Sequence, residues 1–256
     1  MKIIAYSSID RTIITYPGLK EVDISDDIAI VLRNRGCAGS WSGDRYIPCD
    51  SHEGPYCSQC SSPDPCVICK GECMKSIKTC CDEHSVYLAA FAPGLIKVGV
   101  TRTPRFETRL KEQGADMGFE LLRLPDGELA RRRERGISAM YPDKVSFNEK
   151  LNSISRRVSE RAIQEIYNKF NPDRAISFRY FKRDISSKPI LIQPGEDVAI
   201  AGRVLGIKGQ VLVIEKRNSF YAVNLDSLIG YEIEEGRGSL NLQTSLSEYD
   251  EEKSHS

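Results

Sequence analysis

The stretch that decides the fold reads CSQCSSPDPCVICKGECMKSIKTCC over residues 57–81 and HSVYLAAFAPGLIKVGVT over residues 84–101. The first string is dense in cysteines and turn-forming residues. The second contains two apolar runs separated by Pro93-Gly94, a pattern typical of two strands joined as a β-hairpin. The sequence therefore predicts a cysteine-rich module followed directly by a folded α/β unit.

The cysteine spacing favours zinc. Two Cys-x2-Cys pairs, Cys57/Cys60 and Cys66/Cys69, have the separation at which two thiolates reach one tetrahedral ion. Disulfides or scattered buried thiols are the alternatives. However, nine is an odd number of cysteines, and the opening MKIIAYSSIDRTIITY is too short and too interrupted for a signal peptide. Because disulfides are rare in a reducing cytosol, we expect a cytoplasmic protein with one or two zinc ions.

A natural partition of the thiols forms two sets of four. The first set is Cys37, Cys49, Cys57 and Cys60, and the second is Cys66, Cys69, Cys73 and Cys81, with Cys80 as the spare. A single site drawn from a mixture of these is the alternative. Residues 37–83 show little hydrophobic periodicity, so metal binding would have to supply the stability that a small core cannot.

The pattern of elements indicates an α+β protein. A hairpin is followed by three helices, over 104–112 with Thr103 as N-cap, 128–140 and 155–170, and by a strand over 119–124. Five segments follow from this reading: an N-terminal β segment (1–36), the zinc module (37–83), the α/β core with its trailing helix (84–185), a small β domain (186–245) and a disordered acidic tail (246–256). No stretch approaches the ~20 apolar residues of a membrane span.

Charge is unevenly distributed along the chain, although the formal net charge is zero. Residues 101–184 carry 19 basic and 13 acidic side chains, a net of +6, whereas residues 1–100 (10 basic, 12 acidic) and 185–256 (7 basic, 11 acidic) are net negative. A solvated helical face would explain the excess by itself. Taken together with the motifs described next, the positive charge of residues 101–184 predicts a surface that binds a polyanion.

Three short motifs carry a resemblance: Val86-Tyr87-Leu88, then Lys97-Val98-Gly99-Val100-Thr101, then Arg109-Leu110. Together they resemble the GIY-YIG nuclease superfamily, and the whole is similar to an uncharacterised family in which a zinc-type cysteine cluster precedes a GIY-YIG-like core. The resemblance covers roughly residues 37–145, with fainter echoes at 206–210 and 228–231. It implies a small sheet with an antiparallel hairpin, flanked by helices, that cleaves DNA or RNA with one divalent cation, Mg²⁺ or Mn²⁺.

The resemblance implies a role for four residues. Tyr87 matches the tyrosine that helps to activate water, and a buried core aromatic is the alternative. Lys97 stands where a second tyrosine is usual; because a protonated lysine has no acceptor, phosphate binding suits it better than general-base catalysis. Arg109 matches the arginine that steadies the phosphate, with Arg102 and Arg105 as alternatives. An ordinary surface arginine would explain Arg109 equally.

Glu134 matches the helical glutamate that holds the divalent cation. At 100° per residue it falls among the apolar residues Ala130, Ile137 and Tyr141, where a carboxylate is costly unless it is paired or metal-bound. A partly buried salt bridge, for instance to Arg109, is the alternative. Asn148 and His84 are weaker candidates, the first as a late polar site residue and the second as a zinc ligand, a site residue or a strand-edge histidine.

Two functions therefore compete. One is a metal-dependent nuclease, and the other is a catalytically inactive, zinc-stabilised protein that binds nucleic acid with the same core. A structural or protein-interaction factor is a third possibility. Dependence on Mg²⁺ separates the first two functions, and the salt dependence of binding separates the second from the third.

Overall fold

The computed structural model describes residues 1–61, 69, 71–73, 80–142 and 144–236. Within these ranges the chain is a mixed α+β protein dominated by strands, which confirms the predicted class. The predicted acidic tail lies outside the described residues. No helix in the described part of the chain is long and apolar enough to cross a membrane.

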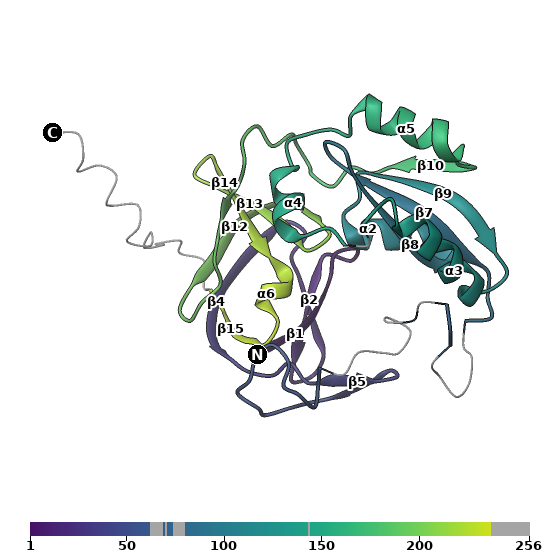
Figure 1. Cartoon of the computed structure of the whole chain (residues 1–256). Helices are drawn as coiled ribbons and strands as arrows, with labels where there is room; N and C mark the ends of the chain where they lie inside the picture. Colours follow the sequence, from purple (N-terminus) through teal and green to yellow (C-terminus); the bar gives the residue numbers. More distant parts are fainter. Residues whose placement is uncertain (62–68, 70, 74–79, 143, 237–256) are drawn as a thin grey trace.

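Strands from both ends of the chain form one nine-stranded sheet, in the order β11-β14-β13-β12-β4-β15-β1-β2-β3. In Figure 1 the purple N-terminal strands and the yellow-green C-terminal strands lie side by side. The alternating apolar pattern predicted the strands but not that the two ends would pair. The strands are β1 (Lys2–Ser7), β2 (Thr12–Tyr16), β3 (Lys20–Asp23), β4 (Asp27–Arg35), β11 (Ile190–Leu191), β12 (Ala199–Lys208), β13 (Val211–Lys216), β14 (Ser219–Asn224) and β15 (Tyr231–Glu235).

This sheet is buried on both faces in its central part. Successive residues of a strand point to opposite faces, and β13 shows both: Leu212 and Ile214 belong to one apolar cluster, Val211 and Val213 to another. The second cluster includes Leu151 of the short helix α4 (Phe147–Asn152). A further short helix, α6 (Leu225–Leu228), follows β14.

The second sheet has four strands in the order β10-β9-β7-β8. These are β7 (His84–Phe91), β8 (Leu95–Arg102), β9 (Met117–Leu124) and β10 (Arg174–Ser177). The predicted hairpin is β7 and β8, which pair antiparallel from His84↔Arg102 to Phe91↔Leu95. Every residue of β7 is buried. The strand that carries the first motif is therefore the centre of this unit.

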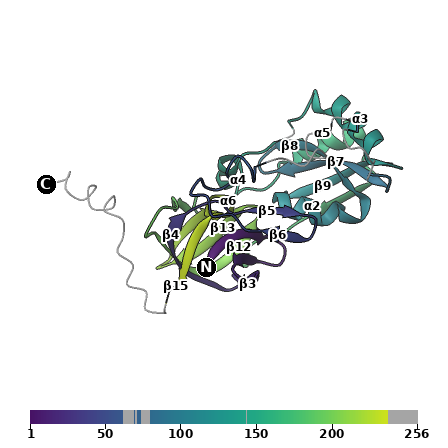
Figure 2. The ribbon, with the colours of Figure 1, turned by 90° about the horizontal axis from the view of Figure 1, so that it is seen from below.

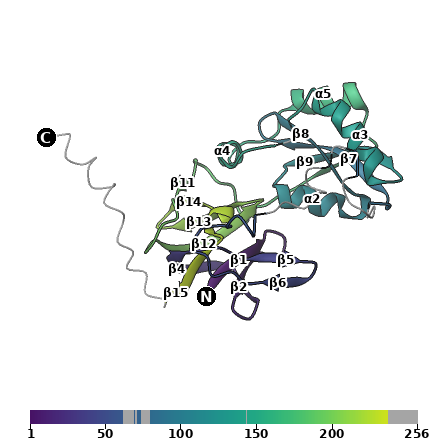
Figure 3. The same ribbon diagram turned by 60° about the horizontal axis from the view of Figure 1, so that its bottom comes forward.

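Helices cover both faces of the four-stranded sheet. Phe106 and Leu110 of α2 (Phe106–Gln113) pack with Tyr87, Ala89 and Phe91 on one face. The opposite face, with Val86, Leu88 and Ala90, is covered by α3 (Gly127–Ser138) and α5 (Glu160–Phe170). Figures 2 and 3 show the two sheets as adjacent bodies, with α4 at their junction.

Two helix boundaries differ from the predictions, and one helix was not predicted. Thr103 does not cap a helix, because a 3-10 turn (Thr103–Arg105) precedes α2 and the Thr103 hydroxyl accepts a hydrogen bond from Ser85 instead. The third predicted helix begins at Glu160 rather than Ser155, with Ser159 as its N-cap. Helix α4 was missed, although Ser146 and Glu149 form a capping box at its start, the S-x-x-E signature of a helix N-terminus.

The two sheets meet where a tight turn of the first touches the end of α2. A Cβ on Gly114 would lie 2.8 Å from the backbone nitrogen of Gly209, so only glycine allows this approach. Both glycines have positive φ, at +72° and +60°. Beside them the buried Lys208 ammonium donates to both carboxylate oxygens of Asp116 at 2.7 Å. The GIKGQ stretch (206–210) therefore joins the nine-stranded sheet to the end of α2, the helix that covers the Tyr87 side of the four-stranded sheet.

Candidate functional site

Four of the predicted zinc cysteines form one cluster. Their sulfur atoms all lie within 4.8 Å of one another, and the set is Cys37, Cys49, Cys57 and Cys60. Cys37 follows the end of β4. Cys49 follows the small hairpin of β5 (Ser40–Ser42) and β6 (Arg45–Ile47), and the Cys57/Cys60 pair occupies a turn in which the Cys60 amide donates to the Cys57 carbonyl. The fold therefore brings together two sequence-distant thiols and one Cys-x2-Cys pair.

The geometry of this cluster fits a tetrahedral ion. Four sulfurs at 2.3 Å from a central zinc would be about 3.8 Å apart, and the Cys49 and Cys57 sulfurs are 3.9 Å apart. The Cys37 sulfur accepts the backbone N–H groups of Gly39 and Cys57 at 3.4 Å, contacts that suit a thiolate ligand. The pKa of the Cys57 thiol is lowered to about 7, chiefly by the backbone N–H of Cys60, whereas burial and the neighbouring cysteines raise the pKa of the Cys60 thiol to about 12. The first predicted set is thus brought together as a cluster that could bind a metal such as zinc.

The cluster is tied to the nine-stranded sheet. The Lys2 ammonium of β1 donates to the carbonyl oxygens of Cys37 and Cys49 at 3.2 and 3.3 Å. The Tyr46 hydroxyl donates to the carbonyl of Ala38 at 2.8 Å. The cysteine cluster is therefore held against the nine-stranded sheet by hydrogen bonds.

The second predicted set is not tested as a whole, because Cys66 lies outside the described residues. What is described of this stretch lies against α3: Arg131 donates to the Cys69 carbonyl at 3.3 Å and Arg132 to the Gly71 carbonyl at 3.0 Å. Cys73 and Cys81 are exposed, and each has an interaction partner. A second zinc ion stays a prediction.

The two hairpin motifs present their key side chains on one face. Tyr87 pairs with Gly99, and Ala89 pairs with Lys97. Cross-strand partners point to the same side of a sheet, and residues two apart on a strand also share a side. Lys97 therefore lies on the same face as Tyr87, as the resemblance implied, and this is the face covered by α2.

Tyr87 is both a core residue and a polar one. Its side chain is 1% exposed and packs edge-on against Phe106, with ring centroids 6.0 Å apart. Its hydroxyl accepts a hydrogen bond of 2.6 Å from the Gln113 amide. A Cβ on Gly99 would lie 2.6 Å from the tyrosine ring, so the glycine of the second motif makes room for the tyrosine of the first.

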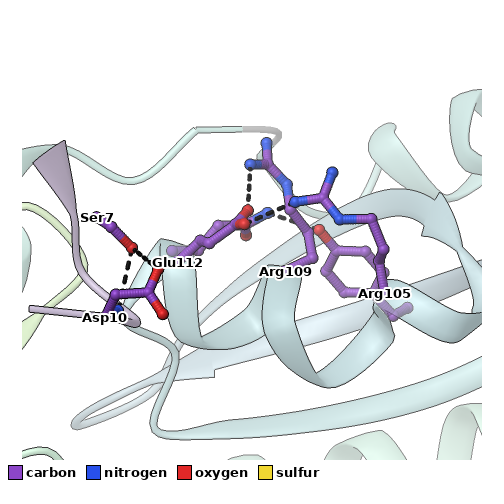
Figure 4. Close-up of polar contacts among 7 residues, drawn as sticks. Ser7, Asp10, Arg105, Arg109 and Glu112 are labelled. Atoms are coloured by element: carbon purple, nitrogen blue, oxygen red, sulfur yellow. Dashed lines mark hydrogen bonds and ion pairs between the residues drawn. The ribbon is translucent and has the colours of Figure 1, made fainter. Parts of the chain in front are cut away.

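Charges from two helices act on the Tyr87 hydroxyl. Burial raises the pKa of this group, the positive charge of Arg109 opposes that shift, and the negative charge of Glu134 adds to it. Arg109 is exposed and pairs with Glu112 at 3.2 Å. Figure 4 shows Arg105 reaching the same carboxylate, at 2.6 Å. Arg109 therefore lies beside the Tyr87 hydroxyl, whereas Glu134 acts on it only through its charge, from the helix that covers the opposite face of the sheet.

Glu134 lies half-buried on α3, beside the buried Ala130 and the partly buried Ile137. It has an interaction partner in the structure. Of the weaker candidates, Asn148 is exposed on α4. His84 is buried at 8% exposure and its Nδ1 lies 2.7 Å from the Asp82 carbonyl oxygen, away from the Tyr87 face.

Two residues of this region were not anticipated. Gln113 lies one helical turn after Arg109, so it shares the side of α2 that carries the arginine. Its Oε1 atom is buried and, within the described residues, has no hydrogen-bond partner. Lys150 of α4 is 6% exposed, donates to Gln210 at 2.6 Å and lies 5.8 Å above the Phe91 ring.

Lys150 adds to a local excess of positive charge. Burial, together with the charges of Lys97, Lys208 and Arg109, lowers its pKa to about 8, against the opposing charge of Asp226. Charges within several ångströms of one another produce such shifts. No sequence periodicity could have revealed this cluster, because its members come from four separate elements.

These features define the class: an α+β protein with a four-cysteine cluster that could bind a metal beside one sheet, and a tyrosine face surrounded by cations on the other. Residues 35–233, more than half of the chain, match the model of the DUF2797 family, described as proteins of unknown function. The chain belongs to this family. Comparison with curated proteins and with solved structures gave no match.

Proposed function

We propose that the protein is a metal-dependent nuclease of the GIY-YIG type that hydrolyses phosphodiester bonds in DNA or RNA. The observation that supports the proposal is the Tyr87 hydroxyl held by Gln113 on the face that also carries Lys97, with the charge of Arg109 acting on it from α2 and that of Glu134 from α3. The order of hairpin, helix, strand and helix in β7 to α3 supports the same reading.

Each residue has a role that its position allows. Arg109 is exposed on α2, so its guanidinium is able to pair with a substrate phosphate once it exchanges Glu112 for that anion. Lys97 shares the face of Tyr87 and contributes a second positive charge. The Gln113 amide holds the Tyr87 hydroxyl in one orientation.

Glu134 is the residue that would hold the divalent cation. It offers one carboxylate, and Mg²⁺ is commonly bound through one or two carboxylates together with water and substrate phosphates. The bound ion would neutralise phosphate charge and supply a water of lowered pKa. The Tyr87 hydroxyl would orient that water or share its proton.

The experiment is a cleavage assay on single-stranded, duplex and branched DNA and RNA, with Mg²⁺ or Mn²⁺ and with a chelator that leaves zinc in place. E134Q is expected to abolish cleavage while binding is retained, because the cation rather than the fold is lost. E165Q, which removes an exposed carboxylate from α5, is the matched control and should cleave normally. R109Q should weaken substrate binding by about 1–3 kcal/mol, the value of charged hydrogen bonds.

A second function is favoured by one specific observation. The Tyr87 hydroxyl is buried and its pKa is raised, which keeps it protonated and unable to accept a proton as phenolate near neutral pH, and lysine replaces the second tyrosine. Both features suit a zinc-stabilised protein that binds nucleic acid without cutting it. Binding without cleavage on every substrate would select this function. Absence of both at low salt, where electrostatic association is strongest, would reject both functions.

A further inference from the structure

Four arginines gather at a surface pocket away from the tyrosine face. The pocket has a volume of about 300 Å³ and lies between the segment that precedes α5 and the segment that follows β10. Its arginines are Arg156, Arg157, Arg179 and Arg183. We call it the four-arginine pocket.

Two of the four arginines in this pocket form no ion pair among the residues that the structure describes. Arg183 pairs with Glu215, and Arg179 makes only a long 3.7 Å contact with the exposed Asp184. Arg156 and Arg157 are exposed, and neither forms an ion pair within the described part of the chain. The pocket's other carboxylate, Asp116, is already bound by Lys208.

Aromatic rings form part of the pocket wall. Phe178 and Tyr180 lie with ring centroids 6.3 Å apart and tilted by 44°, and Phe181 lines the pocket beside them. The Tyr180 hydroxyl donates to the Ala115 carbonyl at 2.6 Å, which fixes its ring. Aromatic rings beside guanidinium groups are the combination with which proteins hold the bases and phosphates of a nucleic-acid strand.

A second pocket continues the first. It has a volume of about 430 Å³ and shares Phe178, Arg179 and Tyr180 with the four-arginine pocket. Its wall adds Arg11, Lys111 and Glu107, the last paired with Arg174, and the Lys111 ammonium lies 5.7 Å above the Phe178 ring. The two adjoining pockets together offer room for more than one phosphate group.

This surface is separate from the tyrosine face. Lys111 and Arg109 are two residues apart on α2, and at 100° per residue they point to nearly opposite sides of the helix. A ligand in the pocket would therefore not occupy the site proposed for cleavage.

We propose that the four-arginine pocket and its continuation bind a single strand of nucleic acid, with Arg156 and Arg157 contacting phosphate groups and the rings of Phe178 and Phe181 contacting bases. The inference goes beyond the proposed nuclease function and does not require catalysis. A free nucleotide presents the same phosphate chemistry and is the competing ligand.

The test measures fluorescence anisotropy of labelled single-stranded DNA and RNA 12-mers with the full-length, zinc-loaded protein. R156Q/R157Q should weaken binding by about tenfold or more, because two charge-assisted contacts are lost. The slope of log affinity against log salt concentration should also become shallower by about 1.4, since each phosphate contact on a single strand contributes about 0.7. R45Q/R161Q removes two exposed arginines elsewhere and should change affinity little. Equal urea midpoints for both double variants would show that folding is intact.

Two further arms separate the alternatives. In an R109Q background, R156Q/R157Q should produce the same fold-loss, which separates this pocket from the tyrosine face. Competition by AMP or inorganic phosphate at concentrations far below those of added salt would assign the pocket to a small phosphate ligand and overturn the strand proposal. Equal affinities of R156Q/R157Q and R45Q/R161Q, or no binding by the wild-type protein at low salt, would overturn it as well. Loss of cleavage without loss of this binding would affect only the nuclease proposal.

Discussion

The contact between Gly99 and Tyr87 provides a sharp test of how the tyrosine face is built. In the G99A variant, the new Cβ would lie 2.6 Å from both the Cζ atom and the hydroxyl oxygen of Tyr87. The ring has little room to retreat, because it is fully buried against Phe106 and its hydroxyl is bonded to Gln113. We therefore expect the ring to shift and the hydrogen bond to break.

The cost can be worked from these contacts. Overpacking of a core typically costs about 1–3 kcal/mol, and the lost Tyr87–Gln113 hydrogen bond adds about 1 kcal/mol. Replacing a glycine in a strand by alanine returns about 0.5–1 kcal/mol through reduced chain entropy. The free energy of unfolding should therefore fall by about 2 kcal/mol.

Urea unfolding followed by circular dichroism measures this difference. G136A is the control, because a Cβ on Gly136 of α3 meets nothing within 4 Å; it should raise stability by about 0.5–1 kcal/mol through helix propensity. In a Y87A background the clash is absent, so G99A should be neutral or slightly stabilising. An equal cost of G99A with and without the Tyr87 ring would refute the packing explanation.

Two further predictions concern the metal cluster and the buried lysine. By elemental analysis, C57S should bind one zinc fewer per chain than the wild type, and it should melt at a lower temperature. The control S58A, in the same turn, should match the wild type in both. Unchanged zinc content in C57S would contradict a metal site at the cluster. The pKa of Lys150 is lowered to about 8 from the 10.5 of a free lysine, so between these pH values the unfolded chain binds more protons than the folded one. The difference in the free energy of unfolding between wild type and K150M should therefore grow in favour of the wild type as pH rises from about 8 to 10.5. A difference that stays constant over this window would show that the pKa of Lys150 is not perturbed.

The local features of this protein followed from short sequence patterns. The hairpin of β7 and β8 was predicted from two apolar runs around Pro93-Gly94, and the structure confirms both strands. The Cys57/Cys60 spacing predicted a shared metal site, because two residues between thiols leave them on one tight turn. Such features depend on neighbours in sequence, so composition and spacing were enough. Even here α4 was missed, although its capping signature was present in SFNE.

Other features depended on which elements meet in space. Alternation of apolar residues predicts strands at both ends of the chain. It shows which face of a strand is buried but not which strands pair. The pairing of β4 with β12 and β15 was therefore decided by the tertiary structure. Cys37 and Cys49 reach the same point as the Cys57/Cys60 turn only because β4 and the β5–β6 hairpin bring them there.

The sites show the same division. Sequence motifs point to Tyr87, Lys97, Arg109 and Glu134. The places of Gln113, Lys150 and the four-arginine pocket depend on packing. The sequence gives the polarity of each side chain but not its burial. The burial that lowers the pKa of Lys150 arises because α4 packs at the junction of the two sheets. The sequence by itself determined the residue types available for chemistry, and the tertiary structure decided which of them act at the same place.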